Sequence, residues 1–191
     1  MGFKILGMEK FLMTKFKKWA EHEYSKKQRM IAIVFGGVIF WIIIPFFIII
    51  ASFYIDRWFH LPKFVYGIIN SVIGLLFIII GWLFANWTVK IQFSVGKGTP
   101  IPLMATQKLV IKGPYTYCRN PMTLGTMIFY LGIAIWMGSL SAVGLALLYP
   151  AGILIYIKII EEKELEERFG SEYFEYKKRT PFLIPRLWKR D

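Results

Sequence analysis

Four long apolar runs dominate the chain. Residues 30–55 and 64–88 each exceed the about 20 residues that a helix needs to cross about 30 Å of hydrocarbon, and residues 121–137 and 140–160 follow. Gly138 and Ser139 separate the last two runs and predict a tight turn within a helical hairpin. The third run is short but can still cross when flanking residues lie in the interface. The pattern predicts an all-α, polytopic membrane helical bundle with four transmembrane helices.

Single residues refine this picture. Asn120 before Pro121 predicts a helix start, in which the Asn side chain accepts from a free backbone N–H and proline occupies the first helical position. Pro45 predicts a kink inside the first span. Gly74 and Gly81, together with Gly67, predict a smooth face for close helix packing.

The remaining segments are more polar. Residues 3–19 interleave large apolar side chains with Lys and predict an interfacial amphipathic helix, which brings the expected number of helices to five. Residues 89–120 contain six Gly or Pro and predict a structured loop or a few short helices. We therefore expect two parts, residues 1–88 with the amphipathic segment and the first two spans, and residues 89–191 with a loop, a hairpin and a C-terminal cytoplasmic tail.

Charge placement predicts the orientation. The chain has 24 Lys and Arg against 12 Asp and Glu, a net charge of +12. Assigning alternate connections to the cytoplasm puts 22 of the 24 basic residues on that side, so both termini are expected to be cytoplasmic in a multi-pass membrane protein, at the cell membrane in a prokaryote. Basic residues that flank apolar spans indicate a lipid bilayer as the partner and not nucleic acid. The oligomeric state stays open.

One cysteine, Cys118, excludes an internal disulfide and offers no cluster of metal ligands, so we expect no metal site. We expect this thiol to be accessible to reagents from the cytoplasmic side only.

Candidate chemistry lies in two polar segments on that side, residues 89–120 and 158–191, which should meet. Free N–H groups at the helix start, residues 121–124, suit a carboxylate or phosphate, although a capped membrane helix alone would look the same. Glu161 and Glu162 directly follow an apolar span, where a carboxylate needs a cationic or hydroxyl-bearing partner such as Arg119 or a ligand. The later acids of this run are expected on a solvated face, namely Glu164, Glu166 and Glu167.

A family resemblance rests on these segments. The run LVIKGPYTYCRNPMTLG, followed after the hairpin by EEKELEERFGSEYFEYKKRTPFLIP, resembles the isoprenylcysteine carboxyl methyltransferase and phospholipid methyltransferase superfamily. The resemblance covers roughly residues 98–188. It departs at two positions, since the family His is Asn120 here and the second motif Tyr is Thr123.

The resemblance implies an S-adenosylmethionine pocket at the cytoplasmic surface, with S-adenosylhomocysteine as product. Its cofactor residues would be Gln107, Lys108, Leu109, Val110, Tyr115, Asn120, Pro121, Met122, Thr123 and Glu161. In direct methyl transfer, Arg119 would orient an anionic acceptor, or Glu162 would remove a proton from an amine. Lys158 stands beside the position where the isoprenylcysteine enzymes place a substrate Arg, and Trp87 is a candidate for the acceptor's entrance. The acceptor would be a lipophilic small molecule or a prenylated one.

Two other readings stay open. A sterol-type membrane reductase resembles this superfamily in its C-terminal half but uses NADPH. A nonenzymatic transport or assembly protein is disfavoured by the lack of buried acids and bases within the expected spans, since Asp56 and His60 fall in a connection.

Overall fold

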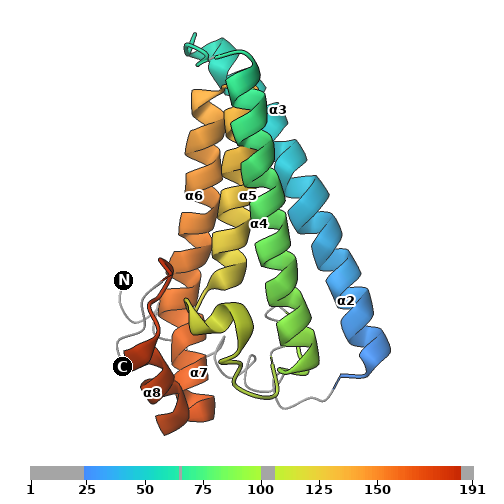
Figure 1. Ribbon diagram of the computed structural model, residues 1–191, viewed down its shortest axis with the longest axis vertical. Coiled ribbons are helices and arrows are strands. Elements are labelled where there is room, and N and C mark those ends of the chain that lie inside the picture. The colour runs from blue at the N-terminus through green and yellow to red at the C-terminus, as the bar shows by residue number, and fades with distance from the viewer. Residues whose placement is uncertain (1–23, 65, 100–105, 186–191) are drawn as a thin grey trace, which may run out of the picture.

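A computed structural model describes residues 24–64, 66–99 and 106–185 of the protein. They form an all-α bundle of apolar helices with short helices packed at one end (Figure 1). The N-terminal segment 3–19 lies outside the described residues. The elements are α2 (Lys26–Val38), η1 (Ile39–Ile43), α3 (Ile44–Trp58), α4 (Ile68–Ser94), η3 (Gly113–Thr116), α5 (Pro121–Met137), α6 (Leu140–Tyr156), η4 (Ile157–Glu161), α7 (Glu162–Phe169) and α8 (Ser171–Arg179).

Four apolar helices lie where the sequence predicts the spans. Three continuous helical stretches are long and apolar enough to cross a membrane, namely Lys26–Trp58, Ile68–Ser94 and Leu140–Phe169, and the 17-residue α5 is the shorter fourth. The first begins earlier than expected because Ser25 and Gln28 form a capping box. α3 also continues to Trp58, so Asp56 lies in a helix and not in a connection. Its carboxylate accepts from the Ser141 hydroxyl at 2.5 Å. The protein is therefore a multi-pass membrane protein.

A π-helical turn precedes Pro45 in the first span, where the sequence predicts a kink. The N–H of Ile44 bonds to the carbonyl of Ile39, five residues back, and Pro45 has no N–H to donate. The carbonyl of Phe40 is thereby left without a partner inside the helix. The hydroxyl of Tyr130, on α5, donates to it at 3.0 Å. A proline and a buried tyrosine together fix the main chain at Phe40.

Glycines bring α4 and α5 into close contact. A Cβ added at Gly74 would lie 2.8 Å from the carbonyl oxygen of Gly132, and one added at Gly125 would lie 2.8 Å from the N of Ala85. A Cβ at Gly81 would collide with the backbone of Phe129. The expectation of a smooth face is confirmed for Gly74 and Gly81. It is wrong for Gly67, which precedes α4 at φ 59° with nothing near its Cβ position.

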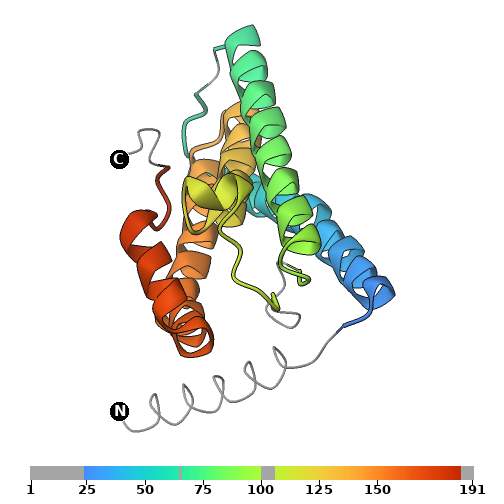
Figure 2. The same cartoon turned by 60° about the horizontal axis from the view of Figure 1, so that its bottom comes forward.

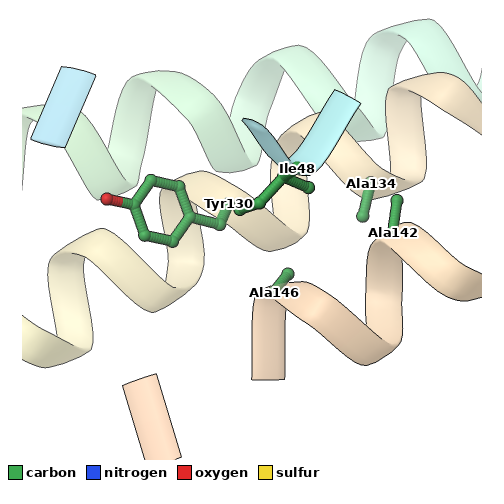
Figure 3. Packing of buried hydrophobic residues seen from close by; sticks show 5 residues of the cluster. All are labelled: Ile48, Tyr130, Ala134, Ala142 and Ala146. Carbon is green, nitrogen blue, oxygen red and sulfur yellow. The ribbon is translucent and has the colours of Figure 1, made fainter. Parts of the chain in front are cut away.

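The α5–α6 hairpin turns as the sequence predicts. Gly138 ends α5 in the left-handed conformation, at φ 62°, and the Ser139 hydroxyl accepts from the N–H of Ala142 at 3.0 Å to begin α6. Small residues then allow the two helices to pack on α3. Figure 3 shows this buried cluster, which consists of Ile48, Tyr130, Ala134, Ala142 and Ala146.

The two ends of the bundle differ in polarity. At one end the short turn of the hairpin pairs with the connection before α4, where the N–H of Phe64 donates to the carbonyl of Gly138 at 3.0 Å. At the other end the segment before α5 packs against α7 and α8, as the two views show (Figure 1 and Figure 2). The prediction that both long polar segments lie on one side and meet is confirmed.

Candidate functional site

A cavity of about 250 Å³ opens at the polar end of the bundle, and we call it the main cavity. The start of α5, the segment before it, η4 and α8 supply most of its walls. Figure 2 views the molecule with this end brought forward. The main cavity is lined by Phe40, Gln92, Thr106, Leu109, Val110, Tyr115, Arg119, Asn120, Pro121, Met122, Thr123, Thr126, Ile153, Tyr156, Ile157, Glu161, Leu165, Tyr173 and Tyr176.

Most of the residues predicted for a cofactor line this cavity. They are Leu109, Val110, Tyr115, Asn120, Pro121, Met122, Thr123 and Glu161, and they are joined by Arg119. Five other predicted residues do not line it, namely Gln107, Lys108, Glu162, Lys158 and Trp87. Lys108 is exposed, and the N–H of Gln107 bonds to the carbonyl of Gly96 at 2.7 Å. Trp87 is 42% exposed beside Phe84, which suits a lipid-facing aromatic side chain.

The start of α5 contributes backbone donors. Pro121 occupies the first helical position as predicted, but the side chain of Asn120 does not cap the helix. Its Nδ2 donates to the carbonyl of Phe182 at 2.8 Å, so the expected cap is wrong and the amide fastens the C-terminal segment instead. No described residue accepts from the N–H groups of Met122 and Thr123. These donors, at the positive end of the helix dipole, suit an anion.

The acidic pair is divided between two environments. η4 is a π-helical turn in which the N–H of Glu162 bonds to the carbonyl of Ile157, five residues back. This wider turn keeps Ile153, Ile157, Glu161 and Leu165 on the main cavity while Glu162 points elsewhere. Among the described residues, the Glu161 carboxylate has no ion pair or hydrogen bond. Glu161 is therefore the carboxylate available to a ligand in the cavity.

Glu162 is held by three cations. It forms a short ion pair with Arg119, and its Oε2 lies 3.0 Å from Lys158 Nζ and 3.2 Å from Lys177 Nζ. The Arg119 and Glu162 side chains are only 8% and 3% exposed. The expectation that Arg119 partners the acidic pair is confirmed for Glu162. Its carboxylate balances charge around Arg119, a group that itself lines the cavity.

Further contacts join the loop to the C-terminal helices. The Tyr176 hydroxyl donates to the carbonyl of Tyr115 at 2.8 Å, and the N–H of Arg119 donates to the carbonyl of Pro181 at 2.9 Å. Arg168 bonds both to the Glu164 carboxylate at 2.7 Å and to the carbonyl of Thr106 at 2.5 Å. These contacts hold the cavity walls in place.

The charge run of α7 is therefore only partly a solvated face. Glu164 is buried by its pairing with Arg168, so the solvated position expected for it is wrong. Glu166 is partly buried and pairs with Lys177 at 2.6 Å. Glu167 is exposed, as expected.

Burial sets the protonation of the phenols in and around the cavity. Desolvation raises the pKa of Tyr115 well above its ordinary value, and the charge of Glu161 adds to the shift. The pKa of Tyr173 is raised by burial and by Glu162, and that of Tyr176 is raised chiefly by burial. All three phenols therefore remain neutral and keep their hydroxyl protons at physiological pH.

Cys118 is buried directly before Arg119. Its side chain has no exposed surface, and desolvation raises the pKa of the thiol to about 11. The expected accessibility of this thiol to reagents is wrong for the folded protein. Within the described residues no group of three or more His, Cys, Asp or Glu could hold a metal ion.

Sequence reasoning missed several lining residues that distant elements supply. Phe40 comes from the π turn of the first span, and Gln92 comes from the last turn of α4. The Oε1 of Gln92 is buried without a hydrogen-bond partner among the described residues. Nothing in the sequence around either residue marks it as part of a site, although a polar Gln at the end of an apolar span is a candidate for a functional residue.

These features define an integral membrane protein with a cavity at its polar end, built from a helix start, a free carboxylate and neutral phenols. Residues 69–172 match the phospholipid methyltransferase family, and the chain belongs to that family.

Curated relatives are similar over part of their length. Methanethiol S-methyltransferase 1 of Bradyrhizobium diazoefficiens is 35% identical over 50% of this chain and 30% of its own length. The cobalt-zinc-cadmium resistance protein CzcN of Cupriavidus metallidurans is 37% identical over 41% of this chain and 36% of its own. The nickel-cobalt-cadmium resistance protein NccN of Alcaligenes xylosoxydans xylosoxydans is 33% identical over 42% of this chain and 37% of its own. The matches thus span about a third of each relative.

Proposed function

We propose that the protein transfers a methyl group from S-adenosylmethionine to a lipophilic acceptor. Membership of the phospholipid methyltransferase family supports the reaction class. The observation that carries the proposal is the separation of the acidic pair, which leaves Glu161 on the main cavity, a cavity that Met122 and Thr123, with their free N–H groups, also line. The methionine part of the cofactor carries an ammonium and a carboxylate group. The ammonium needs an anionic partner, and the carboxylate needs N–H donors.

The described residues fit the chemical parts of this cofactor. The methionine carboxylate would accept from the α5 N-terminus, and the nearby Arg119 guanidinium would favour its charge. Glu161 would accept from the ammonium group or from ribose hydroxyls. Leu109, Val110 and the neutral Tyr115 would flank the adenine ring. When bound, the cofactor supplies an electrophilic methyl group on a sulfonium.

The residues of the chain contribute alignment and exclusion of water, because methyl transfer is a direct displacement that needs no covalent enzyme intermediate. Glu162 has three cationic partners and does not line the cavity. We therefore assign it the positioning of Arg119, whereas the roles of base for Glu162 and of acceptor ligand for Lys158 remain hypotheses from the sequence. The acceptor would approach from the lipid, which surrounds the apolar helices of the protein.

Charge also supports a cytoplasmic orientation for the main cavity. At one end of the bundle the last turn of α3 carries Arg57, the connection before α4 carries Lys63, and the turn at Gly138 has no charge. The opposite end carries the basic residues of the loop, α7 and α8. The positive-inside rule then places the cavity on the cytoplasmic side.

Thermal unfolding in detergent tests the cofactor assignment. S-adenosylhomocysteine should raise the unfolding midpoint, since ligand at 100 times its Kd stabilises a protein by about 2.7 kcal/mol, whereas NADPH should not. Glu161→Gln should weaken S-adenosylhomocysteine binding about tenfold or more through loss of a charged hydrogen bond. Glu167→Gln, on the exposed face of the same helix, is the matched control. No stabilisation by S-adenosylhomocysteine at saturation would refute the proposal, and stabilisation by NADPH alone would favour a reductase.

A further inference from the structure

A second cavity, which we call the side cavity, lies next to the main one and has a volume of about 190 Å³. α2 and η1 supply six of its lining residues, α4 supplies Asn86 and Val89, and α5 supplies Met122. Phe40 and Met122 line both cavities. These two residues border both cavities, so the two cavities adjoin at the start of α5.

The main chain at Phe40 is held in a defined place. The Phe40 carbonyl accepts from the buried hydroxyl of Tyr130 because the π turn before Pro45 leaves it unpaired in its own helix. Figure 1 shows α2 diverging from α4 toward its first residues, and both helices line the side cavity. At that end Arg29 spans the two helices, with its Nη1 donating to the carbonyl of Phe93 at 3.0 Å and its guanidinium over the Phe93 ring.

The walls of the side cavity select against charge. Its described lining contains no ionisable side chain, and its polar side-chain groups are the indole N–H of Trp41 and the amide of Asn86, whose Nδ2 already donates to the Trp82 carbonyl at 2.7 Å. A carboxylate, phosphate or ammonium placed here would lose its hydration without gaining a counter-ion. An apolar, uncharged molecule loses nothing by the same transfer and gains from leaving water.

Volume sets the size of the occupant. An apolar protein cavity of about 150 Å³ holds one benzene molecule, so the side cavity accommodates a somewhat larger group. A farnesyl chain or a pair of acyl chains is larger than this volume. The room depends on glycine, since a Cβ added at Gly37 would meet nothing closer than Trp41 Cδ1 at 3.8 Å, and a longer side chain would extend into the space.

We propose that the side cavity is the acceptor site and that the acceptor is a small, uncharged, apolar thiol. The proposal rests on the proposed function and names its substrate class. The six residues from α2 and η1 precede residue 69, where the family match begins, so the acceptor site is built largely by a part of the chain outside that match. A relative named for methanethiol is consistent with a thiol acceptor of this size.

The transfer balances without another reactant. A lone pair of the acceptor sulfur attacks the donor methyl carbon, and a carbon–sulfur bond forms as the bond from that carbon to the sulfonium breaks. The bonding electron pair returns to the sulfonium sulfur, which becomes a neutral thioether. The thiol proton leaves to water, so the positive charge of the sulfonium appears as a released proton. The acceptor sulfur and the donor would meet beside Phe40 and Met122, where the two cavities adjoin.

Filling the side cavity provides the test. Gly37→Leu is compared with Gly152→Leu, since Gly152 lies in a membrane helix with nothing within 4 Å of its Cβ position. The binding probe is benzyl methyl sulfide, a product analogue, measured by thermal shift in detergent with and without S-adenosylhomocysteine. The activity probe is phenylmethanethiol, compared with N-acetyl-farnesylcysteine and with phosphatidylethanolamine vesicles.

Gly37→Leu should weaken probe binding and raise the KM for phenylmethanethiol about tenfold or more, since small changes in an apolar pocket discriminate by 10- to 200-fold. Affinity for S-adenosylhomocysteine should change less than about twofold in both variants, which also shows that they fold. If Gly37→Leu does not fold, Val89→Ala serves instead, and it should improve naphthylmethanethiol relative to phenylmethanethiol.

Two outcomes overturn the proposal. The first is that these variants change neither the KM for the thiol nor the affinity for the probe. The second is that the protein methylates the farnesyl or phospholipid substrate in preference to the thiol. Failure of the proposed function looks different. In that case S-adenosylhomocysteine does not stabilise the wild-type protein, whereas probe binding that depends on Gly37 persists and still supports the side cavity as an apolar ligand site.

Discussion

Replacing Glu162 by Ala should loosen the wall of the main cavity by stranding a buried charge. The Arg119 side chain is 8% exposed and loses its one buried carboxylate partner, whereas Lys158 and Lys177 are 55% and 31% exposed and can turn to water. Breaking a buried ion pair from one side costs about 3–5 kcal/mol, and exposed pairs contribute about 1 kcal/mol or less. The loss at Arg119 therefore dominates.

Cys118 supplies the assay because it is the one cysteine of the chain, is fully buried and directly precedes Arg119. A fluorogenic maleimide reacts with it only when the loop opens. If the whole penalty falls on that opening, the labelling rate should rise about 100-fold to several thousand-fold, since about 1.4 kcal/mol corresponds to a factor of ten. Glu167→Ala, an exposed acid of the same helix, should leave the rate near that of the wild type.

A double variant separates the stranded charge from general disruption. Arg119→Met with Glu162→Leu removes both charges and keeps side-chain volume, so labelling should return toward the slow wild-type rate. A Glu162→Ala protein that labels within threefold of the wild type would refute the reasoning. Equal labelling of the single and double variants would show that the helix contact matters, and not the unpaired guanidinium.

Three further predictions follow from single positions. Gly81→Ala should reduce the free energy of unfolding by an overpacking cost of about 1–3 kcal/mol, and so lower the thermal midpoint, because its Cβ would meet the backbone of Phe129. Gly144→Ala, with nothing within 4 Å of its Cβ position, should leave the midpoint unchanged. Equal midpoints of the two variants would contradict the close α4–α5 contact. Gln92→Met should weaken S-adenosylhomocysteine binding about 2- to 10-fold by removing a hydrogen-bond acceptor that has no partner among the described residues. Gln92→Glu retains an acceptor at this position. An unchanged affinity of Gln92→Met would mean that the ligand does not bond to this oxygen. Lys112 and Lys63 are both exposed, at opposite ends of the bundle. In a Cys118→Ser background, a membrane-impermeant thiol reagent should label Lys112→Cys only from the cytoplasm and Lys63→Cys only from the opposite side. Labelling of both variants from the same side would overturn the orientation.

Local sequence signals predicted the spans but not the contacts between them. Apolar length and the Gly138 turn gave the four helices, because each signal lies within its own segment. The π turn near Pro45 was foreseen only as a kink, since the partner of the freed Phe40 carbonyl is Tyr130, 90 residues away. Phe40 was absent from the predicted site for the same reason.

The candidate site shows the same division. Leu109, Tyr115 and Thr123 were predicted and line the main cavity, because a motif keeps them at fixed offsets beside the helix start. Asn120 was assigned as a cap from its local position, yet a more distant acceptor, the Phe182 carbonyl, takes its amide. Glu164 was expected in solvent because the sequence does not reveal that Arg168 would bond Thr106 across the site.

The brevity of α5 has a consequence for the membrane. Its 17 residues rise about 25 Å, less than the hydrocarbon thickness of about 30 Å. With the Gly138 turn at one bilayer surface, Asn120 and the floor of the main cavity lie several ångströms beneath the opposing headgroups. On the proposed function, a water-soluble donor would descend to that depth, and an apolar acceptor would arrive without leaving the acyl chains. Bilayers of shorter lipids should relieve this mismatch, so turnover in proteoliposomes should depend on acyl-chain length as well as on substrate.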